Sequence, residues 1–401
     1  IILIPGAVVY FFFAKPTAGA VLGALLLVLL ISLVVLVLTC ALGFVVAKIS
    51  TKLKNKSFLT VFISLAFFGA YYFFYFRASA MLKALIANMD AVGTAIRGSA
   101  YPLYLLGRVG EGDGMAMLIV TAAVLALTAL TYLLLDRSFI AIATAKGGNA
   151  KVRYRERAAV CRSPRRAMLA KEFARFTSSP NYMLNCGLGT LFILAAAVYL
   201  LVRGGTLHEV LAEVFAENPD FSAVVAIGGI CLLASMNDTA APSVSLEGKS
   251  LWIAQSLPVH PWTVLRAKLM VQLILTAPPV LLASVSALLV LRPSPAAAVA
   301  VVVLPLFYVL LSALFGLMLG VRNANLAWTN EIVPIKQSGS VLLAMFAGWG
   351  YALLFVLGAL FLGDLVPFSA FAAVLAVLNA ALCFLLYRWL RTRGAERFAA
   401  L

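Results

Sequence analysis

Histidine and acidic side chains are scarce in this chain, and their scarcity excludes most enzyme chemistry. The 401 residues include only 2 His and 15 Asp or Glu. Acid–base catalysis needs paired titratable groups, and metal sites need clustered His, Cys or carboxylate ligands. The sequence has neither a CxxC spacing nor a His-rich segment. We therefore expect no catalytic residue and no metal site, and a membrane-embedded lipid enzyme is the least favoured function.

Cysteine is also scarce, and its placement argues against disulfides. Of the five Cys residues, Cys161 lies in a basic segment and the other four lie in apolar segments. Those four are Cys40, Cys186, Cys231 and Cys383. None falls in a segment that we assign to the outer face of a membrane, where disulfides would form. We expect no structural disulfide.

A nucleotide-binding loop is lacking as well. Gly248-Lys249-Ser250 looks like the end of a phosphate-binding loop, but Ser243 stands where that motif needs its first glycine. The motif also follows a β-strand, whereas an apolar span precedes this segment. The chain is therefore expected to have no ATPase activity and no cofactor of its own.

Apolar residues, in contrast, make up 64% of the chain, well above the roughly 45–50% of soluble domains. A membrane-spanning helix needs about 20 predominantly apolar residues. Nine segments are predicted as complete spans: 20–46, 57–76, 115–135, 182–202, 222–240, 269–291, 296–321, 339–362 and 369–387. Residues 1–14 look like the end of a tenth. The sequence predicts an all-α polytopic membrane protein.

The net charge of +16 is distributed unevenly between alternate loops. Of the 31 Lys and Arg residues, 24 lie in one set of loops and seven in the other. The richer set comprises residues 47–56, 136–181, 241–268, 322–338 and 388–401. Basic residues collect on the cytoplasmic side of membrane proteins. We therefore assign this set and the C-terminus to the cytoplasm, and we expect anionic lipid, not nucleic acid, to meet the excess charge.

An internal repeat predicts two halves. The segments LGFVVAKISTKLKNKSFLTVF and LFGLMLGVRNANLAWTNEIVPIKQSGSVLL each place LG near the inner end of a span, followed by a basic loop and a span that begins at Ser. Repeats of this kind are typical of transporters. On this interpretation residues 1–135 hold the last four spans of a first half, 136–162 form a basic cytoplasmic linker, and 163–401 form a six-span second half. Because the sequence begins inside an apolar segment, at Ile1, we expect a longer protein with twelve spans.

The second half begins with a predicted amphipathic helix at 164–177. Ser163-Pro164 is suited to the N-cap and first turn of a helix. Leu169, Phe173 and Phe176 then recur at helical spacing. The basic residues around them are Arg165, Arg166, Lys171 and Arg175. We predict that this helix lies in the inner membrane interface, and a solvated linker helix is the alternative.

The polar loop 243–262 is predicted to contain a short cytoplasmic helix from Leu246 to Ser256. Leu246, Ile253 and Leu257 fall on one face, and Leu251 and Trp252 are predicted to be exposed on another. Exposed apolar side chains of this kind suit a partner's groove. The alternative is an interfacial helix whose Trp anchors at the lipid headgroups.

Polar residues within the predicted spans are few, and polar groups are costly inside a membrane. They are Asn185, Asn237, Asp238, Gln272 and Asn379. We consider them candidates for a substrate path, although interhelical hydrogen bonding is the favoured interpretation of each.

Residues 163–401 resemble the membrane subunits of bacterial type-2 ATP-binding-cassette (ABC) exporters. The segments KEFARFTSSPNYMLN, SLEGKSLWIAQSLPV and WTNEIVPIKQSGSVL carry the resemblance, together with the helix 164–177 and the polar loop between the second and third spans. Residues 1–135 resemble the family more loosely. The outer loop 363–368 departs from the family because it is very short.

The resemblance implies that loop 243–262 docks into a cleft on a separate ATPase subunit, and that two such subunits supply ATP and magnesium. The implied coupling residues are Glu247, Gly248, Lys249, Leu251, Trp252, Leu257 and Pro258. It also implies a bacterial cytoplasmic membrane location and a permease for amphipathic or apolar cargo. A homo-oligomer is compatible with this assignment. The main alternative is an ion-gradient-driven secondary transporter, for which Asp238 is the one suitable carboxylate.

Overall fold

The computed structural model describes residues 11–12, 17–50, 56–87, 101–143, 163–215, 220–363 and 365–401. Helices account for nearly all of these residues, and these ranges contain no β-strand. Eight of the described helices are long and apolar enough to cross a membrane. The chain is therefore an all-α, multi-pass membrane protein. Most of the predicted span 1–14 and of the predicted linker 136–162 lies outside the described residues.

The chain divides into two compact units, Ile1–Glu156 and Arg157–Leu401. The helices of unit 1 are α2 (Ala18–Ser50), α3 (Lys56–Ala87), α5 (Tyr101–Glu111) and α6 (Gly114–Ala143). Helices α2, α5 and α6 pack together around Leu30, Val109 and Val120. Most other large apolar side chains of these helices are exposed, as expected for surfaces that face lipid.

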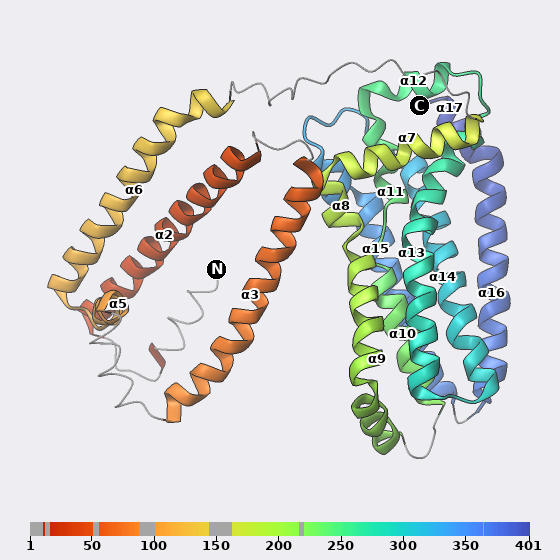
Figure 1. Ribbon diagram of the computed structural model, residues 1–401, viewed down its shortest axis with the longest axis horizontal. Coiled ribbons are helices and arrows are strands. Elements are labelled where there is room, and N and C mark those ends of the chain that lie inside the picture. The colour runs from red at the N-terminus through yellow and green to blue at the C-terminus, as the bar shows by residue number, and fades with distance from the viewer. Residues whose placement is uncertain are drawn as a thin grey trace. The chain divides into compact units, whose positions relative to one another are not determined.

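Unit 2 is a helical bundle with a layer of short helices across one end (Figure 1). Its elements are α7 (Pro164–Ser178), α8 (Pro180–Cys186), α9 (Leu188–Val214), α10 (Phe221–Ala234), α11 (Ala240–Ser243), η1 (Ser245–Ser250), α12 (Leu251–Ser256), α13 (Pro261–Leu291), α14 (Pro295–Arg322), η2 (Val333–Gln337), α15 (Gly339–Leu362), α16 (Phe368–Trp389), η3 (Leu390–Gly394) and α17 (Ala395–Ala399).

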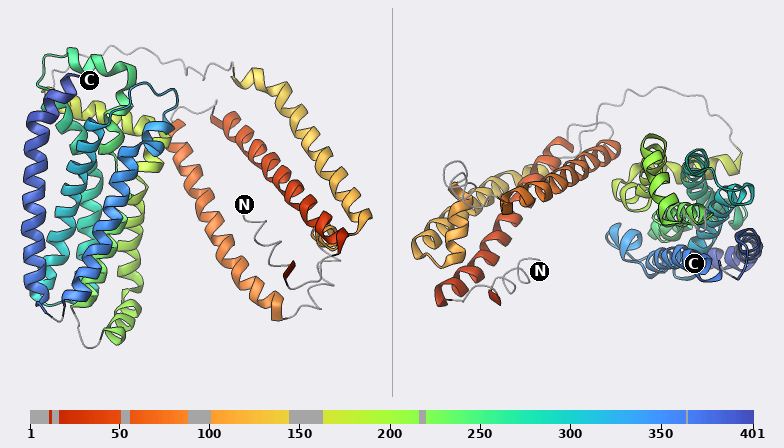
Figure 2. Two further views of the ribbon diagram at one scale, coloured as in Figure 1. Left: turned by 180° about the vertical axis from the view of Figure 1, so that it is seen from behind. Right: turned by 90° about the horizontal axis from the view of Figure 1, so that it is seen from below.

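The long helices of unit 2 pack around one apolar core. Helix α13 packs along α9 and α14, α14 also packs against α16, and α10 lies against α14 and α15. The end-on view in Figure 2 shows these helices gathered into a single bundle. Ile227 of α10 and Val301 and Leu304 of α14 are buried at its centre. This core is apolar, so it needs no hydrogen-bond partners beyond those of the helix backbones.

The short helices α7, α12 and α17 lie together at one end of the bundle (Figure 1). Gln255 of α12 donates hydrogen bonds to the carbonyl oxygens of Phe398 and Ala399 in α17, at 3.0 and 3.4 Å. Phe398 itself is buried against this end of the bundle. The structure thus brings the predicted inner segments of unit 2 together at one end.

The predicted span 222–240 is wrong as a continuous helix. Helix α10 ends at Ala234, and α11 begins at Ala240 after a break. In the break, Asn237 bonds to Thr190 of α9 through both atoms of its amide, at 2.9 and 3.0 Å. Short polar side chains that find other partners compete with helix formation. Only a 14-residue apolar helix remains, which is shorter than a full span.

The predicted span 182–202 also begins differently. It starts as α8, and the helix is interrupted at Gly187 before α9 begins. A Cβ atom at Gly187 would lie 2.7 Å from the ring of Phe176, so glycine lets α7 pack closely against this break. Helix α9 then runs without interruption to Val214. The bend allows the chain to turn from the end layer into the bundle.

Candidate functional site

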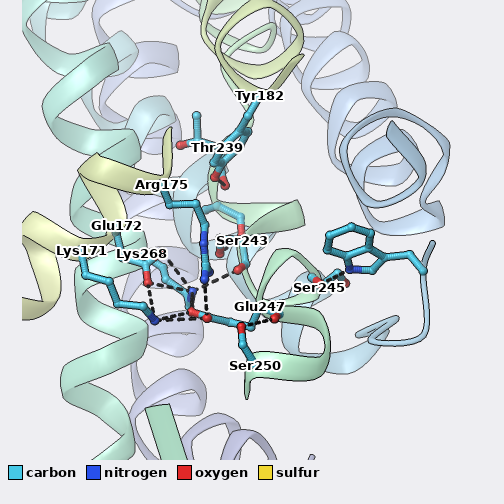
Figure 3. Close-up of polar contacts among 12 residues, drawn as sticks. Lys171, Glu172, Arg175, Tyr182, Thr239, Ser243, Ser245, Glu247, Ser250 and Lys268 are labelled. Carbon is cyan, nitrogen blue, oxygen red and sulfur yellow. Dashed lines mark hydrogen bonds and ion pairs between the residues drawn. The ribbon is translucent and has the colours of Figure 1, made fainter. Parts of the chain in front are cut away.

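Glu247 lies at the centre of a group of charges at the end of the bundle that carries the short helices (Figure 3). Its carboxylate oxygens accept from Lys268 Nζ at 2.7 Å, from Arg175 Nη2 at 2.7 Å and from Lys171 Nζ at 2.8 Å. Glu172 completes the group. We call these five residues (Lys171, Glu172, Arg175, Glu247 and Lys268) the ion cluster.

Lys268 of α13 bonds to residues of three other elements, α7, α11 and η1. Its ammonium group contacts both carboxylate oxygens of Glu172 on α7 at 3.1 Å. It also donates to the carbonyl oxygen of Ser243 at the end of α11 at 3.0 Å, besides its bond to Glu247 in η1. The Lys268 side chain is 0% exposed. All three ammonium hydrogens thus have acceptors, which is the condition for keeping a charged Lys buried.

Helical spacing explains how α7 contributes three members of the cluster. Lys171 and Arg175 are one turn apart and lie on one face of α7, so both reach the same carboxylate. Glu172 is on the adjoining face and points to Lys268. The cluster contains three cations and two carboxylates. The surplus positive charge is closest to water at Lys171, whose side chain is the most exposed of the five.

Contacts within the ion cluster shift the pKa values of Glu247 and Arg175. Burial alone would raise the pKa of the Glu247 carboxyl, but the charges of Lys268 and Arg175 outweigh burial and hold its pKa well below its usual range. Burial alone would lower the pKa of the Arg175 guanidinium, and its hydrogen bond to Glu247 raises that pKa instead. Glu247 is therefore ionised at neutral pH and tied to its partners.

Gly248 allows the loop to turn immediately after Glu247. Its φ of +52° lies in the left-handed region, which favours glycine. A Cβ atom there would lie 3.2 Å from the ring of Trp328, in the segment between α14 and η2. The Trp328 indole in turn donates a 2.6 Å hydrogen bond to the carbonyl oxygen of Ser245. The predicted single helix from 246 to 256 is therefore wrong, because the chain bends at Gly248 inside η1 and α12 begins only at Leu251.

One predicted exposure in this loop is also wrong. Leu251 is only 3% exposed and packs into the core at this end of the bundle. Glu247, which the resemblance assigned to partner contact, has a side chain that is 1% exposed. Trp252, in contrast, is 64% exposed. Of the remaining coupling candidates, Gly248 is buried, whereas Lys249, Leu257 and Pro258 are exposed. Ile253 is exposed beside them.

Helix α7 agrees with the predicted bounds of 164–177 to within one residue, but its faces differ from the prediction. Phe176 is buried, whereas Leu169 and Phe173 are only half-buried. Arg165 and Arg166 are exposed, as the amphipathic pattern requires. Lys171 and Arg175, predicted to surround the apolar face, turn inward because the carboxylate of Glu247 lies there.

A cavity of about 330 Å³ lies beside the break between α10 and α11. Most of its wall is apolar. Its lining residues come from the break and from α13, α14, α15 and α16: Ser235, Asn237, Asp238, Gln272, Tyr308, Leu311, Ser312, Phe315, Ala344, Ala347, Gly348, Tyr351, Leu382 and Leu386. Cavities that bind small molecules have volumes of about 300–1,000 Å³ and similar apolar walls.

The structure brings four of the five predicted path residues to this cavity. Asn237, Asp238 and Gln272 line it, and Asn379 donates a 2.7 Å hydrogen bond to the hydroxyl of the lining residue Tyr351. Asn185 is elsewhere, exposed on α8, and bonds within its own helix.

Three of these polar groups are occupied in holding helices together. Asn237 bonds to α9, Asn379 bonds to Tyr351, and Gln272 accepts from the backbone N–H of Ala240 at 2.9 Å. Asp238 differs from them. Its Oδ1 accepts a long 3.4 Å bond from Ala241, and its Oδ2 is buried with no hydrogen-bond partner among the described residues.

Sequence reasoning missed Lys268, Tyr308 and Tyr351. Lys268 was counted among the loop residues, although it lies two turns inside α13, among apolar residues where a charge signals a buried partner. The tyrosines were read as ordinary span residues. Their rings lie 4.8 Å apart in the wall of the cavity.

The chain matches no known family, no curated protein and no solved structure.

Removal of the Lys268 charge should strongly destabilise the chain. Lys268→Met leaves two carboxylates buried without their shared cation, a change that costs about 3–5 kcal/mol of unfolding free energy at comparable sites. Thermal unfolding of the purified protein in detergent measures the effect. Arg166→Ala, on the exposed face of α7, is the control and should change the stability by less than about 0.5 kcal/mol. Similar losses in the two variants would contradict the role of the cluster.

Acid should weaken the contribution of Glu247. Because its folded pKa is depressed, its stabilisation is complete above the unfolded pKa of about 4.3 and is lost as the pH falls below that value. The melting temperature of the native chain should therefore exceed that of Glu247→Gln by a constant margin near neutral pH, and the margin should shrink below about pH 4.3. A margin that stays the same down to pH 3 would show that the carboxylate does not hold the cluster.

Proposed function

We propose that the chain is the transmembrane permease of an ATP-driven exporter and is worked by separate ATPase subunits bound at loop 243–262. In this scheme the chain has two conformations, and the ATPases shift their populations. The chain contributes neither ATP chemistry nor magnesium binding, which belong to the partner subunits. Two ATPase sites fit a chain of two halves, with the C-terminus and the loop on the cytoplasmic side of a bacterial membrane.

The observation that carries the proposal is an exposed apolar surface on a fixed support. Trp252, Ile253 and Leu257 are exposed on and just beyond α12. The same loop is held to α7 and α13 by Glu247 in the ion cluster. A force applied to these exposed side chains would therefore be transmitted through Glu247 to α7 and α13.

The loop is also supported from the opposite side of the end layer. Trp328 bonds to Ser245, and Gln255 bonds to the C-terminal helix α17. A helix that only anchored in lipid headgroups would not need attachment to α7, α13, α17 and the segment before η2. These attachments favour transmission of movement over simple anchoring.

Loss of the exposed apolar side chains should abolish ATPase binding. The double variant Trp252→Ala with Leu257→Asp removes the aromatic anchor and puts a charge in the contact, and truncation of such anchors costs at least about 2 kcal/mol each. Co-purification of the chain with the ATPase encoded beside it measures the association.

Leu365→Asp is the matched control, because Leu365 is 77% exposed in the turn between α15 and α16, at the other end of the bundle. This control should bind the ATPase normally. All variants must insert into the membrane at the native level. Native ATPase binding by the double variant would contradict the proposal.

One observation favours an ion-gradient-driven transporter as a second candidate. Secondary transporters place binding sites at broken helices, and here a broken helix carries the buried carboxylate Asp238. This candidate predicts that the chain alone, in proteoliposomes without ATPase, dissipates an imposed sodium or proton gradient and that Asp238→Asn stops the flux. The exporter predicts no flux in either protein.

A further inference from the structure

Two polar side chains that line the cavity beside the α10–α11 break have buried atoms without a hydrogen-bond partner among the described residues: the Asp238 carboxylate and the Tyr308 hydroxyl. Asp238 is the only carboxylate among the lining residues. Asp238 is 8% exposed, and its Oδ2 lacks a hydrogen-bond partner among the described residues. None of the ion pairs found in the described part of the chain involves Asp238. A buried carboxylate without a partner is costly, and proteins retain such groups chiefly where they serve a function.

The amide side chains that line the cavity do not donate hydrogen bonds to the Asp238 carboxylate. Gln272 uses its oxygen for Ala240 and its amide nitrogen for Ser312, at 2.9 and 3.4 Å. Asn237 uses both amide atoms for α9. The nearest backbone donor, from Ala241, is at 3.4 Å. Asp238 Oδ2 is therefore open to a donor supplied by a ligand in the cavity.

The rest of the cavity wall suits a ligand that has an apolar part and a hydrogen-bond donor. Tyr308 and Tyr351 present two aromatic rings, and aromatic faces attract cations. Phe315, Leu311 and Leu382 provide apolar surface. The volume of about 330 Å³ is at the small end of ligand cavities. A small molecule with a cationic head and an apolar tail matches both parts of the wall.

We infer that this cavity binds amphipathic organic amines in their protonated form, with Asp238 as the counter-ion and the tyrosine pair beside the cationic head. Inorganic cations fit less well, because they prefer several oxygen ligands and most of this wall is apolar. Binding itself is independent of the proposed exporter function. The further step, that such amines are cargo, rests on that proposed function and deepens it.

The test uses 4-phenylbutylamine as the probe and the purified full chain in nanodiscs, with no ATPase present. Pentylbenzene is the neutral control ligand, since it replaces the amine by a methyl group at nearly constant shape. We expect saturable binding of the labelled amine and a rise in melting temperature with amine concentration. We expect neither for pentylbenzene.

Asp238→Asn should weaken binding of the amine at least tenfold. This variant removes an unpaired buried charge, so its melting temperature without ligand should equal or exceed that of the native chain. Asp220→Asn is the matched control at the other end of α10, where Asp220 accepts from Ser294 and does not line the cavity. It should bind the amine with native affinity.

Ala344→Phe tests the cavity without altering its charge. Ala344 lines the cavity from α15, so a larger side chain there should also weaken binding at least tenfold. Equal binding to native chain and Asp238→Asn would overturn the inference, as would equal affinity for pentylbenzene or no saturable binding at all. A melting temperature raised by sodium or potassium salts alone, and only when Asp238 is intact, would replace it with an inorganic cation site. Failure of ATPase docking would leave every one of these results unchanged.

Discussion

The buried ammonium group of Lys268 is the contact on which the layer of short helices at one end of unit 2 depends. It joins Glu172 of α7, Ser243 of α11 and Glu247 of η1 at one point. Two further ion pairs from α7 to Glu247 strengthen the same junction. Apolar packing alone would let a short loop slide over the end of the bundle. Directional bonds to a fully buried charge permit one position only, because each displaced acceptor would leave an uncompensated charge. Specificity of position, more than net stability, is what such a cluster provides.

The helical architecture could be predicted from the sequence because long apolar runs leave little choice. A run of about 20 apolar residues must satisfy its own backbone, and only a helix does so within one segment. The start of α7 could be predicted for a similar local reason, since Pro164 is suited to the first turn, although the Ser163 side chain makes no capping hydrogen bond. Each of these signals lies within a single segment, so it can be read without knowledge of the neighbours.

The predictions that proved wrong concern residues whose conformation depends on contacts with other segments of the chain. Leu251 was expected to face outward, but the left-handed turn at Gly248 rotates α12 so that Leu251 packs inward. The span 222–240 was expected to be continuous, but Asn237 finds its partner on α9 instead. Lys171 and Arg175 were expected to surround the apolar face of α7, but the carboxylate of Glu247, 76 and 72 residues further along the chain, turns them inward. No local pattern contains that information.

The short helix α11 connects the ion cluster to the cavity. Its last residue, Ser243, bonds to Lys268 in the ion cluster, and Asp238 in the cavity precedes its first residue by two positions. Gly316 and Gly320 of α14 let α11 lie close, since a Cβ atom at Gly320 would overlap the carbonyl oxygen of Ala241. With so few residues between them and no flexible segment, Ser243 cannot move far without moving Asp238. The same contacts that fix the loop at rest therefore give a movement of the loop a direct route to the cavity.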